Sequence, residues 1–223
     1  MVRRTKEAAQ ETRSHILDTA EQVFQAKGVS HTTLADIAKA AGVTRGAIYW
    51  HFKNKVDLFQ AMMDRVKLPM EQSVAAGAAS ADPLASLREC ALGVLTQITR
   101  DPQAQRVFEI CSHKVEYADE MSQLRERHIE TRTSFLTHME QAFSQAAKKG
   151  LIRPTVNPRY AAVGLHALVD GLIRNWVLDP KYFPLAKAAG AVIDIYLNSL
   201  SPETGVTSGR RKPGRRNTKA GSK

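Results

Sequence analysis

The chain has 223 residues, of which 43% are hydrophobic and 24% charged, and its formal net charge is +10. This composition excludes a largely disordered chain, and a content of two cysteines excludes a disulfide scaffold. No apolar run approaches the ~18 residues of a membrane span, and no apolar signal core follows the basic amino-terminus, so we expect a cytoplasmic protein without a membrane partner.

The positive charge is concentrated at the carboxyl end. Residues 1–60 carry a net charge of +3, residues 61–200 a net charge of +1 and residues 201–223 a net charge of +6. The last segment is rich in Gly, Ser, Thr, Arg and Lys and lacks the apolar residues needed for a core, so we expect a disordered basic tail. Its cations would add sequence-independent phosphate contacts to a nucleic acid, or serve only solubility.

Helical periodicity begins near the amino-terminus and recurs along the chain, whereas no stretch alternates at period two over strand length. The first apolar stripe ends at Lys27-Gly28, a favourable carboxyl-terminal cap. Thr33 and Asp36 have the spacing of a capping box and predict the start of a short helix. Thr44 begins a second short helix, and Asn54 can cap a fourth helix.

An Asp-Pro or Asn-Pro pair precedes three later amphipathic runs. Asp82-Pro83, Asp101-Pro102 and Asn157-Pro158 each place a side-chain acceptor at the N-cap and proline at the first helical position. Three longer helices are predicted from about Asp119 to Lys149, from Pro158 to Leu178 and from Pro184 to Leu200. The chain is therefore predicted to be all-α, with about nine helices.

Residues 33–55 have the pattern of a helix-turn-helix, with Gly42 at the tight turn. In its second helix Val43, Ile48 and Phe52 fall on one face at helical spacing and point inward. The outer face is left with six residues: Arg45, Gly46, Ala47, Tyr49, Trp50 and His51. Exposed aromatic side chains are costly unless a partner covers them, although an aromatic cluster alone is more often part of a core.

This outer face has the chemistry of a DNA-reading surface. Arg45, at the start of the helix, can reach guanine edges in a major groove. The backbone N–H groups at Thr33 and Thr44, together with Lys55, suit phosphate oxygens. These residues favour a DNA-binding surface, with core packing of the aromatic cluster as the alternative.

The same segment resembles the DNA-binding domain of the TetR family of transcriptional repressors. The resemblance rests on Thr33-Leu34-Ala35-Asp36-Ile37-Ala38, on Gly42-Val43-Thr44 and above all on the run from Gly46 to Lys55, Gly-Ala-Ile-Tyr-Trp-His-Phe-Lys-Asn-Lys. Together with Val2-Arg3-Arg4-Thr5-Lys6, the run is most similar to the AcrR-like branch, which represses multidrug efflux pumps. It implies a DNA-binding domain at 1–54 with a basic arm at 1–10, a ligand-binding and dimerisation domain at 55–200, and a tail at 201–223.

The resemblance also implies roles for individual residues. Base contacts would come from Arg45, Gly46 and Ala47, and phosphate contacts from Thr33, Thr44, Tyr49, Trp50, His51 and Lys55. The last two helices would form a homodimer interface through Val163, Ala167, Gly171, Ala188, Val192, Ile195 and Tyr196, with small residues such as Gly164 allowing close approach. Such a symmetric dimer would read a pseudo-palindromic double-stranded operator.

The efflux-repressor branch further implies a pocket for a lipophilic small-molecule inducer. Its lining would be Val66, Leu92, Phe108, Ser112, Phe135, Met139, His166, Val169 and Asp170. Three of these, Ser112, His166 and Asp170, would orient the ligand among apolar walls. The alternative for Leu92, Phe135 and Met139 is simple core packing, and the histidines fit packing or surface roles better than a metal site.

Pro69 bears on how a ligand would act. Proline removes a backbone donor and is expected to kink or end the helix that begins near Lys55. Residues 54–68 would then act as a lever that moves the reading helices, whereas the alternative is a static kink. If ligand-induced release of DNA were unchanged by Pro69→Ala, the lever would be refuted.

These observations predict a homodimeric, ligand-responsive repressor of an efflux-pump operon that needs no cofactor. Residues 61–200 hold no glycine-rich phosphate loop, Ser-His-Asp motif or clustered metal ligands, so no enzyme is predicted. The alternatives are a regulator of other metabolic genes and a DNA-binding protein without a small-molecule inducer. Operator position would decide between repression and activation.

Overall fold

The structure, a computed structural model, describes residues 2–77, 81–116 and 122–202. Over these residues it has nine helices and no strand, which confirms the predicted all-α class. The helices are α1 Val2–Lys27, α2 Leu34–Ala40, α3 Arg45–His51, α4 Lys55–Gly77, α5 Pro83–Arg100, α6 Pro102–His113, α7 Ser122–Lys148, α8 Pro158–Leu178 and α9 Leu185–Leu200. The predicted tail lies outside the described residues from position 203 onward.

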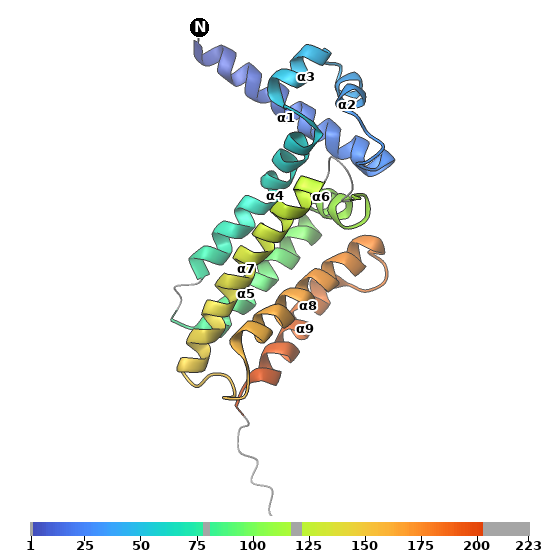
Figure 1. Cartoon of the computed structure of the whole chain (residues 1–223). Helices are drawn as coiled ribbons and strands as arrows, with labels where there is room; N and C mark the ends of the chain where they lie inside the picture. Colours follow the sequence, from blue (N-terminus) through green and yellow to red (C-terminus); the bar gives the residue numbers. More distant parts are fainter. Residues whose placement is uncertain (1, 78–80, 117–121, 203–223) are drawn as a thin grey trace, which may run out of the picture.

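Helices α1 to α3 form a small unit at one end of the molecule, and α4 leads from it into a bundle formed with α5 to α9 (Figure 1). The core of the small unit is made by apolar side chains from all three helices and the start of α4: Ile16, Leu17, Phe24, Ile37, Ile48, Phe52 and Leu58. The basic segment 1–10, expected as an arm, forms the first turns of α1 from Val2 onward.

The predicted caps are present. Thr33 and Asp36 form a reciprocal capping box, and the Thr44 hydroxyl accepts a hydrogen bond from the Ala47 N–H. Asp82 and Asp101 cap α5 and α6 in the same way, which explains where these helices begin.

Helix α4 runs past Pro69 without a break and ends at Gly77. Of the two expected effects of Pro69, an end of the helix is therefore wrong, because a long helix tolerates one missing donor, and a kink stays a prediction. Of the segment 54–68 predicted as a lever, residues 55–68 belong to the same helix as the residues that follow them.

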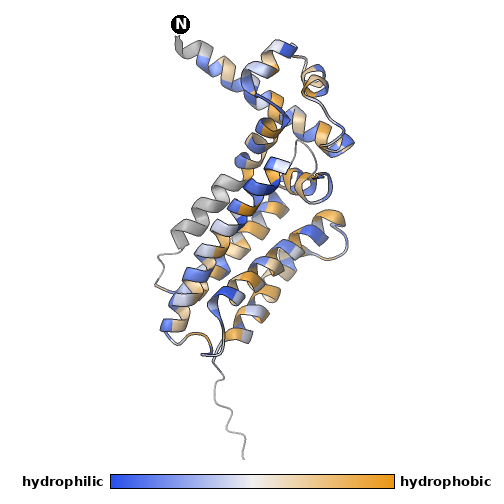
Figure 2. Ribbon diagram, in the orientation of Figure 1, coloured by the Kyte–Doolittle hydropathy of each residue, from blue (hydrophilic) through white to orange (hydrophobic). Residues whose placement is uncertain are grey.

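Helices α8 and α9 lie side by side, and hydrophobic residues recur along both of them (Figures 1 and 2). Gly164 lets them approach, because a Cβ at that position would lie 2.4 Å from the Tyr196 hydroxyl. That hydroxyl donates to the Ala161 carbonyl over 2.7 Å. Gly164 and Tyr196 therefore pack together within one chain. No helix in the described parts of the chain is long and apolar enough to span a membrane.

Candidate functional site

Helix α3 presents aromatic and polar groups to solvent. Ile48 and Phe52 anchor it in the core, and the Arg13 guanidinium lies 5.0 Å from the centre of the Phe52 ring. On the opposite face Tyr49 is 50% and Trp50 73% exposed. Helix α3 thus holds two large aromatic side chains in water on a rigid support, as the sequence predicted for its faces.

Arg45 and Gly46 are exposed beside these aromatic groups, and Ala47 is half-buried. A Cβ at Gly46 would meet only the Thr44 hydroxyl, 3.9 Å away, and Gly46 has no positive φ. The fold therefore does not require glycine here. Gly42, in contrast, has a φ of +65° and makes the turn into α3.

Thr33 and Thr44 mark the amino-terminal ends of α2 and α3. The Thr33 N–H and hydroxyl donate to the Asp36 carboxylate over 2.9 and 2.6 Å, and these bonds lower the pKa of Asp36 below its ordinary 3.8. Both threonines are exposed, as Arg45 is. The Thr33 donors already have a partner, so a phosphate at this position would have to share or replace Asp36.

Lys55 differs from the other predicted DNA contacts. Its side chain is only 7% exposed, and Nζ donates to the carbonyls of Val29 and Ser30 over 2.9 and 3.4 Å. The predicted phosphate contact from the Lys55 ammonium does not fit this conformation. The lysine instead ties the start of α4 to the loop after α1.

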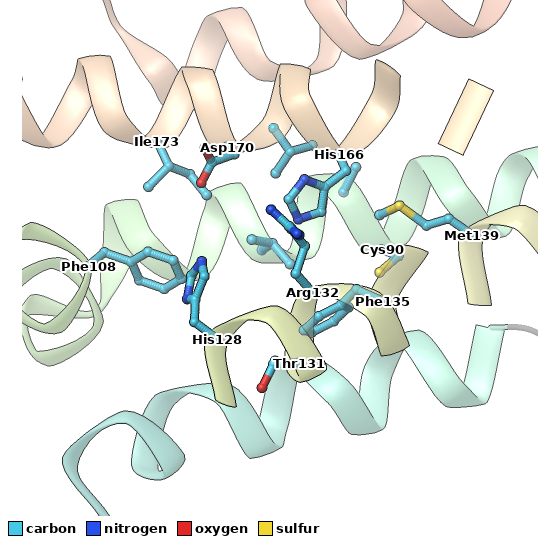
Figure 3. Close-up of a pocket in the computed structure, with 13 residues that line it drawn as sticks. Cys90, Phe108, His128, Thr131, Arg132, Phe135, Met139, His166, Asp170 and Ile173 are labelled. Atoms are coloured by element: carbon cyan, nitrogen blue, oxygen red, sulfur yellow. The ribbon is translucent and has the colours of Figure 1, made fainter. Parts of the chain in front are cut away.

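A second feature is a cavity of about 140 Å³ inside the bundle, between α5, α6, α7 and α8 (Figure 3). Six of the nine residues predicted for a ligand pocket line it: Phe108, Phe135, Met139, His166, Val169 and Asp170. Val66, Leu92 and Ser112 do not. Val66 is 1% exposed and packs in the core, Leu92 packs against that core, and Ser112 is half-buried outside the cavity.

Seven further residues line this cavity: Cys90, Ala91, Val94, His128, Thr131, Arg132 and Ile173. Helical spacing carries the signal for several of them. His128, Thr131 and Arg132 precede Phe135 and Met139 at intervals of three and four, so they share the same face of α7. Following helical spacing back two turns from Phe135 and Met139, the two predicted pocket residues of α7, would have found them.

The polar groups of the cavity differ in charge state. Burial lowers the pKa of His166 below its ordinary 6.5, and nearby Arg132 lowers it further, against an opposing effect of Asp170. Asp170 accepts a hydrogen bond from Arg174 Nε over 2.7 Å. Burial raises the pKa of the Cys90 thiol, which therefore stays protonated near neutral pH.

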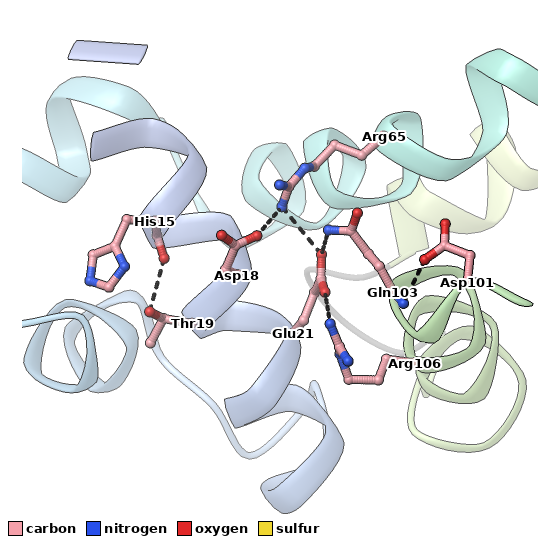
Figure 4. A network of polar contacts seen from close by, with 8 residues as sticks. All are labelled: His15, Asp18, Thr19, Glu21, Arg65, Asp101, Gln103 and Arg106. Atoms are coloured by element: carbon pink, nitrogen blue, oxygen red, sulfur yellow. Dashed lines mark hydrogen bonds and ion pairs between the residues drawn. The ribbon is translucent and has the colours of Figure 1, made fainter. Parts of the chain in front are cut away.

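A buried carboxylate connects the small unit to the bundle (Figure 4). Glu21 on α1 has no exposed side-chain surface, and Gln103 of α6 donates to it over 2.8 Å. Arg65 of α4 and Arg106 of α6 lie 3.3 and 3.4 Å from its two oxygens. Burial raises its pKa above the ordinary 4.5, and these three partners act in the opposite direction. We name these four side chains the Glu21 junction.

A second contact between α1 and α6 runs beside the Glu21 junction. Gln25 Nε2 donates to Glu109 over 2.7 Å, and the Val29 N–H donates to the Lys114 carbonyl over 3.0 Å. Helix α6 also places Phe108 in the cavity. One helix therefore contacts both the cavity and the unit that carries α3.

Helices α8 and α9 expose an apolar face. On α8, Val163 is 46% exposed and Ala167, one turn later, is also exposed; on α9, Ile195 is 71% exposed. Gly171, Ala188 and Val192 are half-buried. A shallow groove at the end of this face is lined by Ala167, Leu168, Gly171, Leu172, Asn175, Tyr182 and Phe183. Within the described residues no three His, Cys, Asp or Glu side chains are grouped so that they could hold a metal ion.

Known proteins resemble this chain in sequence and architecture. Residues 16–62 match the bacterial regulatory proteins of the tetR family, and residues 82–202 match the carboxyl-terminal region of MAATS-type transcriptional repressors. The HTH-type transcriptional regulator TtgR of Pseudomonas putida is 40% identical over 202 residues, which are 90% of this chain and 96% of that protein.

Two solved structures are similar over most of their length. NalD, the secondary repressor of the MexAB-OprM multidrug efflux pump in Pseudomonas aeruginosa, has a TM-score of 0.81 and 37% identity, over 88% of this chain and 99% of that one. A complex of SmeT, the repressor of the Stenotrophomonas maltophilia efflux pump SmeDEF, with triclosan has a TM-score of 0.78 and 30% identity, over 92% and 100% of the two chains.

Proposed function

The chain belongs to the TetR family of bacterial transcriptional regulators, and from this premise we propose that it is a ligand-responsive repressor of a multidrug efflux operon. It would bind a pseudo-palindromic operator as a homodimer in the cytoplasm and leave the operator when a lipophilic compound binds. Among its relatives, NalD is the secondary repressor of the MexAB-OprM multidrug efflux pump, which supports this proposal.

The observation that carries the proposal is the exposed face of α3. Trp50 and Tyr49 stand in water, Arg45 begins the helix, and Gly46 has open space where any other residue would place a side chain. An exposed apolar and cationic face on a firmly anchored helix is what a major-groove reader requires. Arg45 would contact base edges, and the absence of a side chain at Gly46 would let the helix backbone approach the DNA.

The remaining contacts would hold the protein in register on the duplex. Thr33, Thr44, Tyr49, Trp50 and His51 would contact phosphates, which fix orientation without reading sequence. Burial and the nearby Arg13 lower the pKa of His51, so it would act as a neutral hydrogen-bonding group. This proposal assigns DNA binding to residues 1–54 and ligand binding with dimerisation to residues 55–200.

Dimerisation would use the apolar face of α8 and α9. Val163, Ala167 and Ile195 lie on that face, and a second copy would remove them from water. An isologous dimer places two α3 helices a fixed distance apart, so the operator should have two half-sites in adjacent major-groove turns. Tyr196 would support the face from behind, through its hydrogen bond to Ala161.

A ligand in the cavity would act through α6. This helix carries Phe108 to the cavity and Gln103 and Arg106 to Glu21, so a shift of α6 is transmitted to α1 and α4. Such a ligand releases DNA only if it binds the DNA-incompetent arrangement more tightly, and DNA must then weaken the ligand by the same factor. The part of α4 from 54 to 68 would move with it as the lever.

The test is fluorescence anisotropy of the duplex upstream of this gene and its neighbour, against a scrambled competitor. The preformed complex is then titrated with lipophilic antibiotics, dyes and phenols. Specific binding that some of these compounds reverse supports the proposal. Specific binding that no compound reverses leaves the DNA reader intact but contradicts the inducer.

A pair of glycine variants makes this test specific to α3. Gly46→Ala should fold normally, because the added methyl has space, but should weaken operator binding by about tenfold or more because it enters the protein–DNA interface. Gly93→Ala is the matched control, since Gly93 is exposed in α5 and its added methyl meets nothing within 4 Å, whereas that at Gly46 makes one ordinary contact, with the Thr44 hydroxyl at 3.9 Å. Equal operator affinities for the two variants would contradict a reading role for α3.

A further inference from the structure

One of the residues that line the cavity is a cation, Arg132, which is also exposed to solvent and has no carboxylate partner among the described residues. Arg132 extends from α7 toward α8, and its guanidinium ends beside the His166 ring (Figure 3). It forms no ion pair with any carboxylate in the part of the chain that the structure describes. Its N–H donors are therefore available to a ligand that enters the cavity.

The single acidic group among the described lining residues is already neutralised. Asp170 is bonded to Arg174 Nε over 2.7 Å, so its charge is matched by a cation just outside the cavity. His166 is held in its neutral form by burial. The polar end of the cavity consequently carries a positive balance, and a cationic ligand would meet Arg132 as a like charge.

The rest of the lining sets the size and shape of a ligand. Phe108, Phe135, Met139 and Ile173 supply apolar walls, two of them aromatic. The volume of about 140 Å³ is close to that of an engineered cavity, about 150 Å³, that holds one benzene ring. A single aromatic ring therefore fits between these walls without rearrangement of the bundle.

We propose that this cavity selects aromatic weak acids, a ring that bears a carboxylate or phenolate oxygen, and that Arg132 is the residue that determines this preference. The inference rests on the proposed inducer-binding function and names the chemical class of the inducer. The ring would lie among Phe108, Phe135 and Met139, and the oxyanion would accept charge-assisted hydrogen bonds from the Arg132 guanidinium. Neutral relatives of the same ring would bind by the apolar walls alone.

Three compounds of one shape test the charge preference: 4-chlorobenzoate, 4-chlorobenzamide and 4-chlorobenzamidine, which are anionic, neutral and cationic. Calorimetric titration of the full chain should give the tightest binding for the benzoate, by about tenfold over the amide, and the weakest for the amidine. Release of operator DNA, measured by anisotropy, should follow the same order.

Arg132→Gln should bring the affinity for the benzoate down to that for the amide, a loss of about tenfold, and leave the amide unchanged. The control is Arg125→Gln, an exposed arginine two turns earlier on α7 and outside the cavity, which should retain the wild-type order. Thermal melting of both variants checks that they fold as the wild type does.

The outcomes separate this inference from the function on which it rests. If the benzoate and the amidine bind equally well, or if Arg132→Gln changes all three compounds alike, the preference for acids is overturned while inducer binding stands. If none of the three binds but neutral lipophilic compounds release the operator, the ligand class is likewise wrong. If no compound of any charge binds or releases the operator, the proposed inducer function itself fails.

Discussion

The two functional regions of this molecule are built in opposite ways. The proposed DNA-reading surface comes from about twenty consecutive residues, its side chains point outward, and its support is a small core of Ile48, Phe52 and their neighbours. The cavity comes from four helices that are far apart in sequence, and its side chains point inward. The reader is therefore complete before anything binds, whereas the cavity depends on how the whole bundle packs.

Because of this difference, we expect the two regions to move differently. The anchored helix α3 would change little in shape, so a ligand would have to move α1 to α3 together. A cavity between helices changes volume when one helix shifts, and α6 is the helix that also contacts α1. The Glu21 junction lies between the small unit of α1 to α3 and the bundle that encloses the cavity.

The largest effect is expected from breaking that junction. Glu21→Ala leaves Arg65 and Arg106 close together without their shared carboxylate, which should lower the free energy of unfolding by about 3 kcal/mol. Chemical denaturation followed by circular dichroism measures this loss. Gln22→Ala, at the exposed neighbouring position, is the control and should change little.

Glu21→Gln tests whether the Glu21 junction couples inducer binding to operator binding, apart from its effect on the stability of the fold. It keeps the shape and a hydrogen bond to Gln103 but removes the charge that attracts both arginines. We expect operator and inducer each to bind, but with a smaller mutual effect, measured as the ratio of operator affinities with and without inducer. An unchanged ratio would show that the junction only stabilises the fold.

The next largest effect is expected from a substitution in α3, the proposed DNA-reading helix. Arg45→Ala should weaken operator binding by about 10- to 100-fold, the range of a lost base contact, because the guanidinium is exposed at the start of α3. Inducer affinity, measured by calorimetry on the free protein, should stay at the wild-type value. A parallel loss of inducer affinity would mean that the cavity in the free protein depends on α3.

The contrast also explains what the sequence could predict. The caps at Thr33 and Thr44 and the turn at Gly42 act through neighbours three or four residues away, so a local pattern identifies them. Their helices could be placed, and the exposed face of α3 assigned, without tertiary information. Lys55 is the exception, because its ammonium is drawn inside by carbonyls of a loop 25 residues earlier.

The cavity was only partly predictable for the same reason. Phe135, Met139 and His166 line it as predicted, whereas Val66 packs in the core and Ser112 stays outside. Which face of a helix meets a cavity is set by rotation against its neighbours, and periodicity identifies an apolar face without saying what it contacts. The stripe on α7 could still have been extended to Arg132, whose spacing to Phe135 is one helical turn.

A smaller effect tests the turn that orients the reader. Gly42→Ala forces a side chain into a φ of +65° and should cost about 1 kcal/mol of stability. Gly93→Ala has no such strain and should stabilise the protein by about 0.5–1 kcal/mol through its better helix propensity. Thermal melting of the two variants in parallel measures the difference, and equal midpoints would contradict a conformational requirement at Gly42.

The smallest effect distinguishes the two regions by pH. The pKa of His166 is lower in the folded protein than the ordinary 6.5, so the unfolded chain takes up this proton first as the solution is acidified. The stability that neutral His166 contributes is fully present above about pH 6.5 and is lost as the pH falls toward the folded pKa. The pKa of Asp36 in the capping box is lowered from 3.8, so its contribution is lost only below that value. Acidification from pH 7.5 to 5.5 should therefore lower the stability of the wild type relative to that of His166→Gln, since His51 is present in both proteins and its effect cancels. A constant difference across this range would mean that the cavity does not hold His166 in its neutral form.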